Sequence, residues 1–126
     1  MRVRRSSDQF MPAYNHTIPA APPAALARIV FDETLELHAG GETVSLRHAP
    51  AAHTDGDTIV RLTQANVIHM GDVYFNGIWP FIDRASGGSI RGVIAGGDAA
   101  LATADAKTVI VPAHRALVSR AELARY

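Results

Sequence analysis

The chain has 126 residues, 48% of them hydrophobic, with 12 basic residues balancing 12 acidic ones and no cysteine. This length suits one globular domain and is too short for two. The zero net charge argues against nucleic acid and anionic membranes as partners. The lack of cysteine excludes disulfides and thiolate metal sites, so any metal must be held by His and carboxylate.

The first 27 residues are polar and then rich in proline and alanine. Such a composition buries little surface and interrupts regular structure, so we expect an extended or poorly ordered arm over residues 1–27. The basic start, Met1 to Arg5, is followed by polar residues in place of the apolar run of a signal peptide, and no stretch approaches the length of a membrane span. We therefore expect a soluble, cytoplasmic protein with one domain over residues 28–126.

Short runs of apolar and β-branched residues predict strands over residues 28–31, 34–38, 43–48, 58–63 and 67–70. Hairpin turns are expected at Ala39-Gly40-Gly41-Glu42 and at Gln64-Ala65-Asn66. Helical spacing from Ser89 onward predicts a helix that includes Gly92, Gly96 and Gly97. Each glycine weakens a helix by roughly 1 kcal/mol relative to alanine, so tertiary packing must hold this helix in place.

The C-terminal part predicts one more strand and one more helix. The β-branched run over residues 108–111 predicts a buried strand that Pro112 ends. Ser119 and Glu122 have capping-box spacing, which places a short helix over about residues 120–125. The order of elements predicts an α/β fold, a mixed β-sheet with helices on one face. The other face then needs a cover, because an exposed apolar face normally marks a partner surface.

Three polar residues are expected where loops leave the ends of strands, namely His53, Asp72 and His114. Imidazole and carboxylate together suit zinc, and also iron or manganese. Judged by spacing alone the metal signal is weak, since the sequence contains no His-x-His, no His-Glu-x-x-His and no Cys pair.

These residues stand within or beside longer motifs: Ala52-His53-Thr54-Asp55-Gly56-Asp57, Val67-Ile68-His69-Met70-Gly71-Asp72, Asn76-Gly77, Pro80-Phe81-Ile82-Asp83 and Pro112-Ala113-His114. A further motif, Gly87-Gly88-Ser89, stands at the start of the predicted helix. From about Ile29 to Tyr126 the chain resembles the C-terminal half of the metallo-beta-lactamase superfamily, which consists mostly of zinc-dependent hydrolases. The resemblance implies half of an αββα sandwich. It also implies that His53 binds a first metal, Asp72 bridges two metals and His114 binds the second.

The activity implied by the resemblance is attack of a metal-bound hydroxide on an ester, thioester, lactam or phosphoester, with zinc, or else manganese or iron, as the cofactor. An aspartate without a metal role, such as Asp55, would orient the water. A small-molecule substrate is then expected.

Two departures from the family pattern open an alternative. The first ligand motif, His-x-His-x-Asp-His, is absent from the chain, and Pro112-Ala113-His114-Arg115-Ala116 stands where most members have Pro-Gly-His-Gly-Pro. Each metal would keep about two protein ligands, below the three or four that zinc needs. The chain is therefore either a truncated hydrolase or a non-catalytic half domain that acts by homodimerisation or by association with a separate N-terminal half.

The remaining histidines are assigned more ordinary roles. His48 shares a strand face with Val44 and Leu46 and is expected to be a hydrogen-bonded core histidine. His69 lies on the face opposite Asp72 if its strand is regular. His16 and His38 are expected on the solvated surface.

Two further aspartates and a group of aromatic residues lie near the motifs. Asp57 is expected to accept backbone hydrogen bonds in a turn. Asp83 is expected either to hydrogen-bond a ligand histidine or to cap the loop before Gly87 and Gly88, with neither role favoured. The aromatic residues after Asp72 are expected to form core or interface: Tyr74, Phe75, Trp79 and Phe81.

Overall fold

The computed structural model describes residues 2–126, which divide into two compact units after Asp32. The first unit contains the short helix α1 (Arg2–Arg5), a hairpin of β1 (Gln9–Met11) and β2 (His16–Ile18), and two 3-10 turns, η1 (Pro12–Tyr14) and η2 (Pro23–Ala25). Short regular elements therefore occur where the sequence predicted an arm without them. They form because Asn15 adopts a left-handed conformation that closes the hairpin and prolines open both 3-10 turns.

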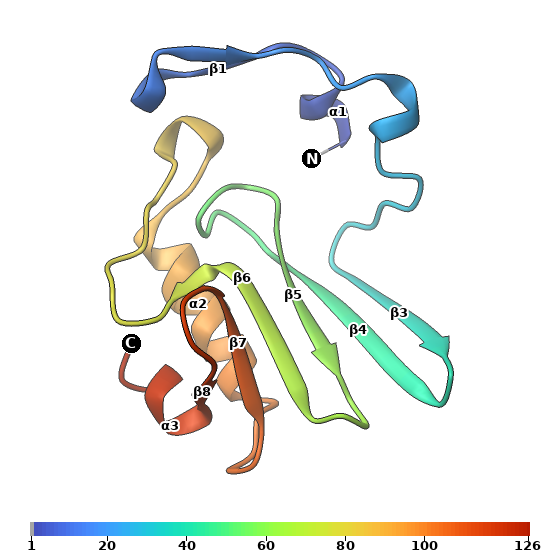
Figure 1. Ribbon diagram of the computed structural model, residues 1–126, viewed down its shortest axis with the longest axis vertical. Coiled ribbons are helices and arrows are strands. Elements are labelled where there is room, and N and C mark those ends of the chain that lie inside the picture. The colour runs from blue at the N-terminus through green and yellow to red at the C-terminus, as the bar shows by residue number, and fades with distance from the viewer. Residues whose placement is uncertain (1) are drawn as a thin grey trace. The chain divides into compact units, whose positions relative to one another are not determined.

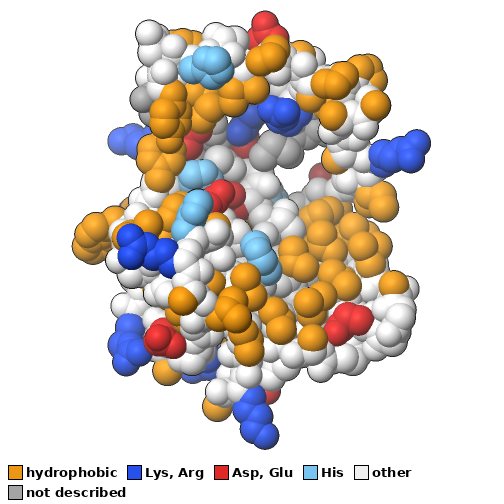
Figure 2. All heavy atoms as spheres, in the orientation of Figure 1, with side chains coloured by type: hydrophobic (Ala, Val, Ile, Leu, Met, Phe, Trp, Pro, Cys, Tyr) orange, Lys and Arg blue, Asp and Glu red, His pale blue; other side chains and the backbone are white. Residues whose placement is uncertain are grey.

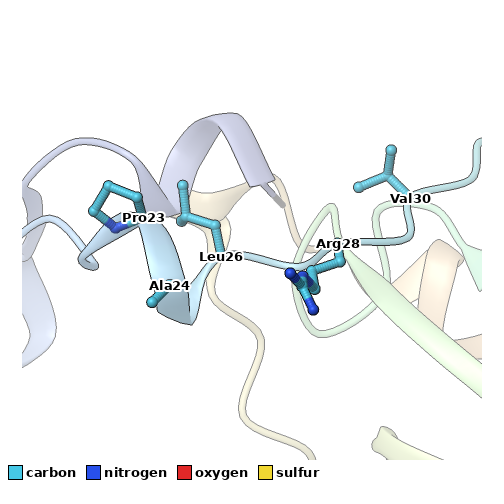
Figure 3. A pocket seen from close by; sticks show the side chains of 5 residues that line it. All are labelled: Pro23, Ala24, Leu26, Arg28 and Val30. Carbon is cyan, nitrogen blue, oxygen red and sulfur yellow. The ribbon is translucent and has the colours of Figure 1, made fainter.

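A shallow hollow in the first unit is lined by Pro23, Ala24, Leu26, Arg28 and Val30. Figure 3 shows that these side chains are spread along the segment and point in different directions. The strand predicted over residues 28–31 is wrong, because these residues form bends in which Ile29 and Val30 are 63% and 62% exposed. A β-branched run alone does not make a strand without a neighbouring strand to pair with.

The second unit is built on a six-stranded sheet in the order β3-β4-β5-β6-β7-β8 (Figure 1). The strands are β3 (Thr34–Ala39), β4 (Glu42–Ala49), β5 (Asp57–Leu62), β6 (Val67–Phe75), β7 (Val109–His114) and β8 (Val118–Ser119). Neighbours are antiparallel except β6 and β7, which are parallel and joined through α2 (Ile90–Leu101). A final helix, α3 (Arg120–Leu123), carries the predicted capping box of Ser119 and Glu122. The mixed α/β sheet predicted from the sequence is confirmed.

Most of the predicted strands and turns are confirmed, but β6 extends to Phe75, beyond the predicted end at Met70. Gly40 and Gly41 both have positive φ, as a two-residue hairpin turn requires. However, β7 continues through Pro112 to His114. Proline is tolerated there because Pro112 pairs with Gly71 at a register shift, where a missing N–H removes no regular ladder bond.

The helix α2 packs closely on the sheet through its glycines. Ser89 caps it by accepting a hydrogen bond from Gly92 N at 3.0 Å. A Cβ at Gly92 would lie 1.9 Å from the carbonyl oxygen of Ala51, and one at Gly96 would lie 2.7 Å from Val73 Cγ1. Only glycine allows this approach. Tertiary packing therefore holds the helix despite its weak propensity, as the sequence analysis expected.

The hydrophobic core lies between α2, α3 and one face of the sheet. Its most deeply buried large side chains are Ile68, Met70, Val73 and Ile110. The core also includes Ala49 and Ile59 from the sheet and Leu123 from α3, all less than a tenth exposed. Of the described residues, none lies in a helix long and apolar enough to cross a membrane. The cytoplasmic location stays a prediction.

The opposite face of the sheet is also apolar, and we call it the open face. It consists of two rows of cross-strand neighbours whose side chains alternate with those of the core. One row runs across β3 to β7 as Leu37, Val44, Leu62, Val67 and Val109. The next row runs in the same order as Leu35, Leu46, Val60, His69 and Val111. Figure 2 shows hydrophobic side chains gathered over β3, β4 and β5 on this face.

Candidate metal centre

The three residues predicted as metal ligands lie together at one end of the sheet. His53 is in the loop between β4 and β5, Asp72 is in β6, and His114 is the last residue of β7. The carboxylate of Asp72 lies between the two rings, with Oδ1 3.3 Å from His114 Nε2 and Oδ2 3.9 Å from His53 Nε2. The ends of two parallel neighbouring strands meet at the same edge, which is why Asp72 and His114 are adjacent.

The ring of His53 is held in one orientation by a backbone carbonyl. Its Nδ1 lies 2.6 Å from the carbonyl oxygen of Phe81. Because a carbonyl only accepts hydrogen bonds, Nδ1 is the donor of this bond, and Nε2 is the ring nitrogen that faces Asp72. The same loop is fixed a second time, since Asp83 N donates to the carbonyl oxygen of His53 at 2.9 Å. This arrangement is the one that metal-binding histidines adopt.

Phe75, at the end of β6, lies between the two imidazoles. Its ring stacks on His114 with a centroid separation of 4.9 Å and lies 6.2 Å from the ring of His53. Phe81 lies 5.7 Å from His53 on centroids. The side chains of His53, Asp72 and His114 are 18%, 41% and 56% exposed, so the site opens towards His114.

A bulge in β6 changes the face on which Asp72 lies. The register with β7 shifts at Gly71, which has a φ of +53°. Beyond the shift Val73 lies against α2 together with Ile68 and Met70, so strict alternation does not continue through the strand. The expectation that His69 and Asp72 occupy opposite faces required a regular strand, and β6 is not regular between these two residues. His69 Nδ1 instead accepts a hydrogen bond from Gly71 N at 3.1 Å.

The neighbouring aspartates have structural contacts. Asp57 Oδ2 accepts a hydrogen bond from Thr54 N at 2.7 Å, which confirms the predicted turn role. Burial raises the pKa of Asp57, and the nearby Asp72 raises it further, although the bond from Thr54 and His53 both act in the opposite direction. Asp83 caps the 3-10 turn η3 (Arg84–Ser86), and its hydrogen bonds from Ser86 lower its pKa.

Of the two roles open for Asp83, the cap of the loop is the one observed, and the group that orients His53 is the carbonyl of Phe81. No motif in the sequence marks this carbonyl as the partner of His53.

Asp55, the predicted catalytic residue, lies two residues after His53. Its backbone N donates to the carbonyl oxygen of Ser86 at 2.9 Å, and its own carbonyl oxygen lies 2.7 Å from His48 Nε2. Its Cβ lies beside Gly87. His48 is hydrogen-bonded as expected, but it is half-buried and lies outside the hydrophobic core, so its predicted core position is wrong. His38 is exposed on β3, as expected. The catalytic role of Asp55 stays a prediction.

The donors suit a metal ion in type but not in number. Two atoms bound to one tetrahedral ion at about 2.0–2.1 Å are roughly 3.3 Å apart, which matches the separation of Asp72 and His114. His53 and Asp72 form a second, looser pair. Across residues 2–126, however, no group of three or more His, Cys, Asp or Glu side chains is arranged to hold one ion. Among the described residues, the two donor pairs share Asp72, and neither pair has a third donor.

A cavity of about 290 Å³ lies elsewhere, between α2 and the strands β3 to β6. Its lining includes Ile59, Ile68 and Ala100, with Arg47 and Arg61 among its polar residues. The guanidinium of Arg61 donates to the carbonyl oxygen of Thr103, which ties β5 to the end of α2. None of the three candidate ligands lines this cavity.

No protein-family model matches the sequence, and no curated protein matches it. The fold, in contrast, is shared with solved structures of metallo-beta-lactamases. A metallo-beta-lactamase from Pontibacter korlensis superposes with a TM-score of 0.66 at 14% identity, over 79% of this chain and 46% of that one.

Two further structures give the same result. TTHA1623, solved in a di-iron-bound form, has a TM-score of 0.67 at 20% identity, over 90% of this chain and 52% of that one. ST1585 from Sulfolobus tokodaii, an archaeal metallo-beta-lactamase superfamily protein, has a TM-score of 0.59 at 21% identity, over 77% of this chain and 37% of that one. The chain therefore has part of the metallo-beta-lactamase fold and spans about half, or less, of the length of these proteins.

Proposed function

We propose that this chain supplies part of the metal centre of a metal-dependent hydrolase, with His53, Asp72 and His114 as its ligands. The observation that carries the proposal is the place of the Asp72 carboxylate, which offers one oxygen to each imidazole at 3.3 and 3.9 Å. A carboxylate placed in this way suits a ligand that serves two ions. Zinc is the metal that the donor set favours, with iron or manganese as further possibilities.

The residues of the chain have separate roles in this proposal. The Phe81 carbonyl keeps the proton of His53 on Nδ1, so that Nε2 binds the ion. Phe75 stacks on His114 and restricts its ring. A metal ion at such a site, when bound, polarises a carbonyl or phosphoryl oxygen and acidifies a water molecule. The substrate class is then a small ester, thioester, lactam or phosphoester.

Asp55 is the proposed residue that orients the attacking water. It has no place in either donor pair, and it lies in the same loop as His53. The hydrogen bonds of its backbone to Ser86 and His48 fix the path of that loop.

Native mass spectrometry after incubation with zinc tests the proposal. The wild-type chain is expected to carry zinc. His53→Ala is expected to lower the zinc affinity at least about tenfold, the loss that is already typical when only a hydrogen-bond partner of a ligand is removed. The matched control is His38→Ala, which removes an exposed histidine on β3 far along the sheet from the centre. Equal zinc binding by both variants would contradict the ligand assignment. Ester, lactam or phosphodiester hydrolysis that survives His53→Ala would contradict the reaction.

A second candidate function is a non-catalytic half domain that acts by association. The number of donors favours it, since one chain completes neither metal position. Arg115 favours it as well, because it places a cationic side chain directly after His114. In this form the partner is a second copy or a separate chain with His-x-His-x-Asp-His. A folded chain that takes up no zinc and shows no hydrolysis is the expected result.

A further inference from the structure

We propose that the open face is the interface of a homodimer, in which a second copy of this chain covers the apolar sheet of the first. The interface itself does not depend on metal binding. Its consequence for the metal centre rests on the proposed function.

The apolar character of the open face is continuous from β3 to β7. Leu37 and Val109, at the two sides of the first row, are 42% and 37% exposed, although a sheet face in a finished core would bury them. Between them the row contains only apolar side chains, and its residues are paired in register across five strands: Leu37, Val44, Leu62, Val67 and Val109. Figure 2 views the sheet from the side opposite α2 and shows hydrophobic side chains gathered on it. A contiguous apolar patch of this kind marks an association surface.

The charges on the open face favour a second copy over a charged partner. Neither row contains Asp, Glu, Lys or Arg. Glu42 lies at the end of the face, two residues before Val44 at the start of β4, but its carboxylate accepts hydrogen bonds from the backbone N–H groups of Thr43, Gln64 and Ala65. A two-fold interface places the same surface against itself, so it must lack like charges that would face each other. The open face meets this condition.

The one polar side chain within the two rows is His69. It stands in register with Val60 on one side and Val111 on the other. Its Nδ1 accepts the hydrogen bond from Gly71 N, so half of its polarity is satisfied within its own chain. A ring satisfied in this way can be covered by an apolar surface at a smaller cost than a ring without partners.

A second copy also addresses the shortage of metal ligands. Each copy brings the same His53, Asp72 and His114. The centre lies at the end of β6 and β7, at the border of the open face. A two-fold axis close to that border would bring the donors of the second copy beside those of the first. Zinc needs three or four protein ligands, and one chain offers two for each position.

The experiment is measurement of mass by light scattering and native mass spectrometry over a concentration series, without metal and with zinc. The wild-type chain is expected at twice the mass of one chain in both conditions. Leu37→Asp and Val109→Asp place a charge at exposed positions of the open face, where the single chain tolerates it, and are expected to weaken dimerisation at least tenfold. The matched control is Ile94→Asp on α2, at an equally apolar residue that is 57% exposed and lies outside the open face.

Each outcome decides between the two proposals. A wild-type monomer, including one that dimerises only after a different chain is added, would overturn the homodimer. A dimer unaffected by Leu37→Asp and Val109→Asp, or equally weakened by Ile94→Asp, would overturn the assignment of its interface to the open face. Circular dichroism confirms that the variants are folded. A dimer that binds no zinc and is weakened by the two face variants supports the homodimer and contradicts the metal-dependent hydrolase. A monomer that binds zinc, and loses it in His53→Ala, supports the hydrolase and contradicts the homodimer.

Discussion

Arg115 adopts a backbone conformation that an arginine rarely takes. Its φ is +75°, in the left-handed region, directly after the candidate ligand His114. Side chains with a Cβ pay roughly 1–2 kcal/mol for this conformation, whereas glycine adopts it freely. The metallo-beta-lactamase pattern has glycine at this position, so the departure seen in the sequence is also a source of strain.

Replacing Arg115 by glycine is therefore expected to stabilise the protein. We expect the free energy of unfolding to rise by roughly 0.5–1 kcal/mol for Arg115→Gly, because relief of strain exceeds the extra entropy of the unfolded chain. Urea unfolding measures the change. Arg115→Ala is the control, since it removes the charge but keeps the Cβ, and it is expected to give no gain. Equal stabilisation by both variants would assign the effect to charge and contradict the backbone explanation.

At this same scale the sequence predicted the three candidate ligands but not the groups that position them. His53, Asp72 and His114 were found because imidazole and carboxylate occur in recognisable motifs, and the structure brings them together. The carbonyl of Phe81 has no such signal, because every residue has a backbone carbonyl and only the path of the loop places this one 2.6 Å from His53. The assignment of these residues as ligands stays a prediction.

Among the elements, α2 was predicted at the right place, but its apolar spacing does not mark the face that is buried. Two of the large apolar residues with helical spacing, Ile90 and Ile94, are 53% and 57% exposed. The buried residues are Val93, Gly96 and Ala100. The spacing of large apolar side chains predicts a helix, but close packing of α2 on the sheet uses mainly small residues. The spacing therefore does not predict which side of α2 faces the sheet.

The glycines of α2 consequently differ in what a methyl group would do. Gly92→Ala is expected to lower the free energy of unfolding by roughly 2–3 kcal/mol, because its Cβ would overlap the carbonyl oxygen of Ala51, a backbone atom that cannot move aside alone. The same change is expected to displace the loop that carries His53. Gly97→Ala meets no atom within 4 Å and is expected to stabilise the helix by about 1 kcal/mol. Thermal unfolding compares the two variants, and loss of stability in both would contradict the packing described for α2.

The strands show where local sequence reasoning stops. The hairpin of β3 and β4 was predicted because Gly40 and Gly41 mark its turn and alternation marks its strands. The bulge at Gly71 was not, because its effect depends on how β6 pairs with β7, a strand nearly forty residues later. The two-residue strand β8 is likewise too short to leave a pattern.

At the scale of the whole molecule, the sequence predicted an uncovered sheet face and the structure contains one. An apolar run such as Val109 to Val111 indicates burial on both sides, and in the described chain only the core side of Ile110 is fully covered. In the homodimer proposed above, a second copy covers the other side.

The division of the chain after Asp32 leads to a last prediction. The sheet, α2, α3 and the core all come from residues 33–126, and β3 begins at Thr34. Since a unit with its own core can fold alone, a shortened chain of residues 33–126 is expected to keep the unfolding midpoint of the full chain within a few degrees, and to keep its zinc affinity. Circular dichroism during heating, with zinc titration, makes the comparison. Loss of cooperative unfolding on shortening would show that residues before Glu33 contribute to the core, and loss of zinc affinity alone would assign them a ligand such as His16.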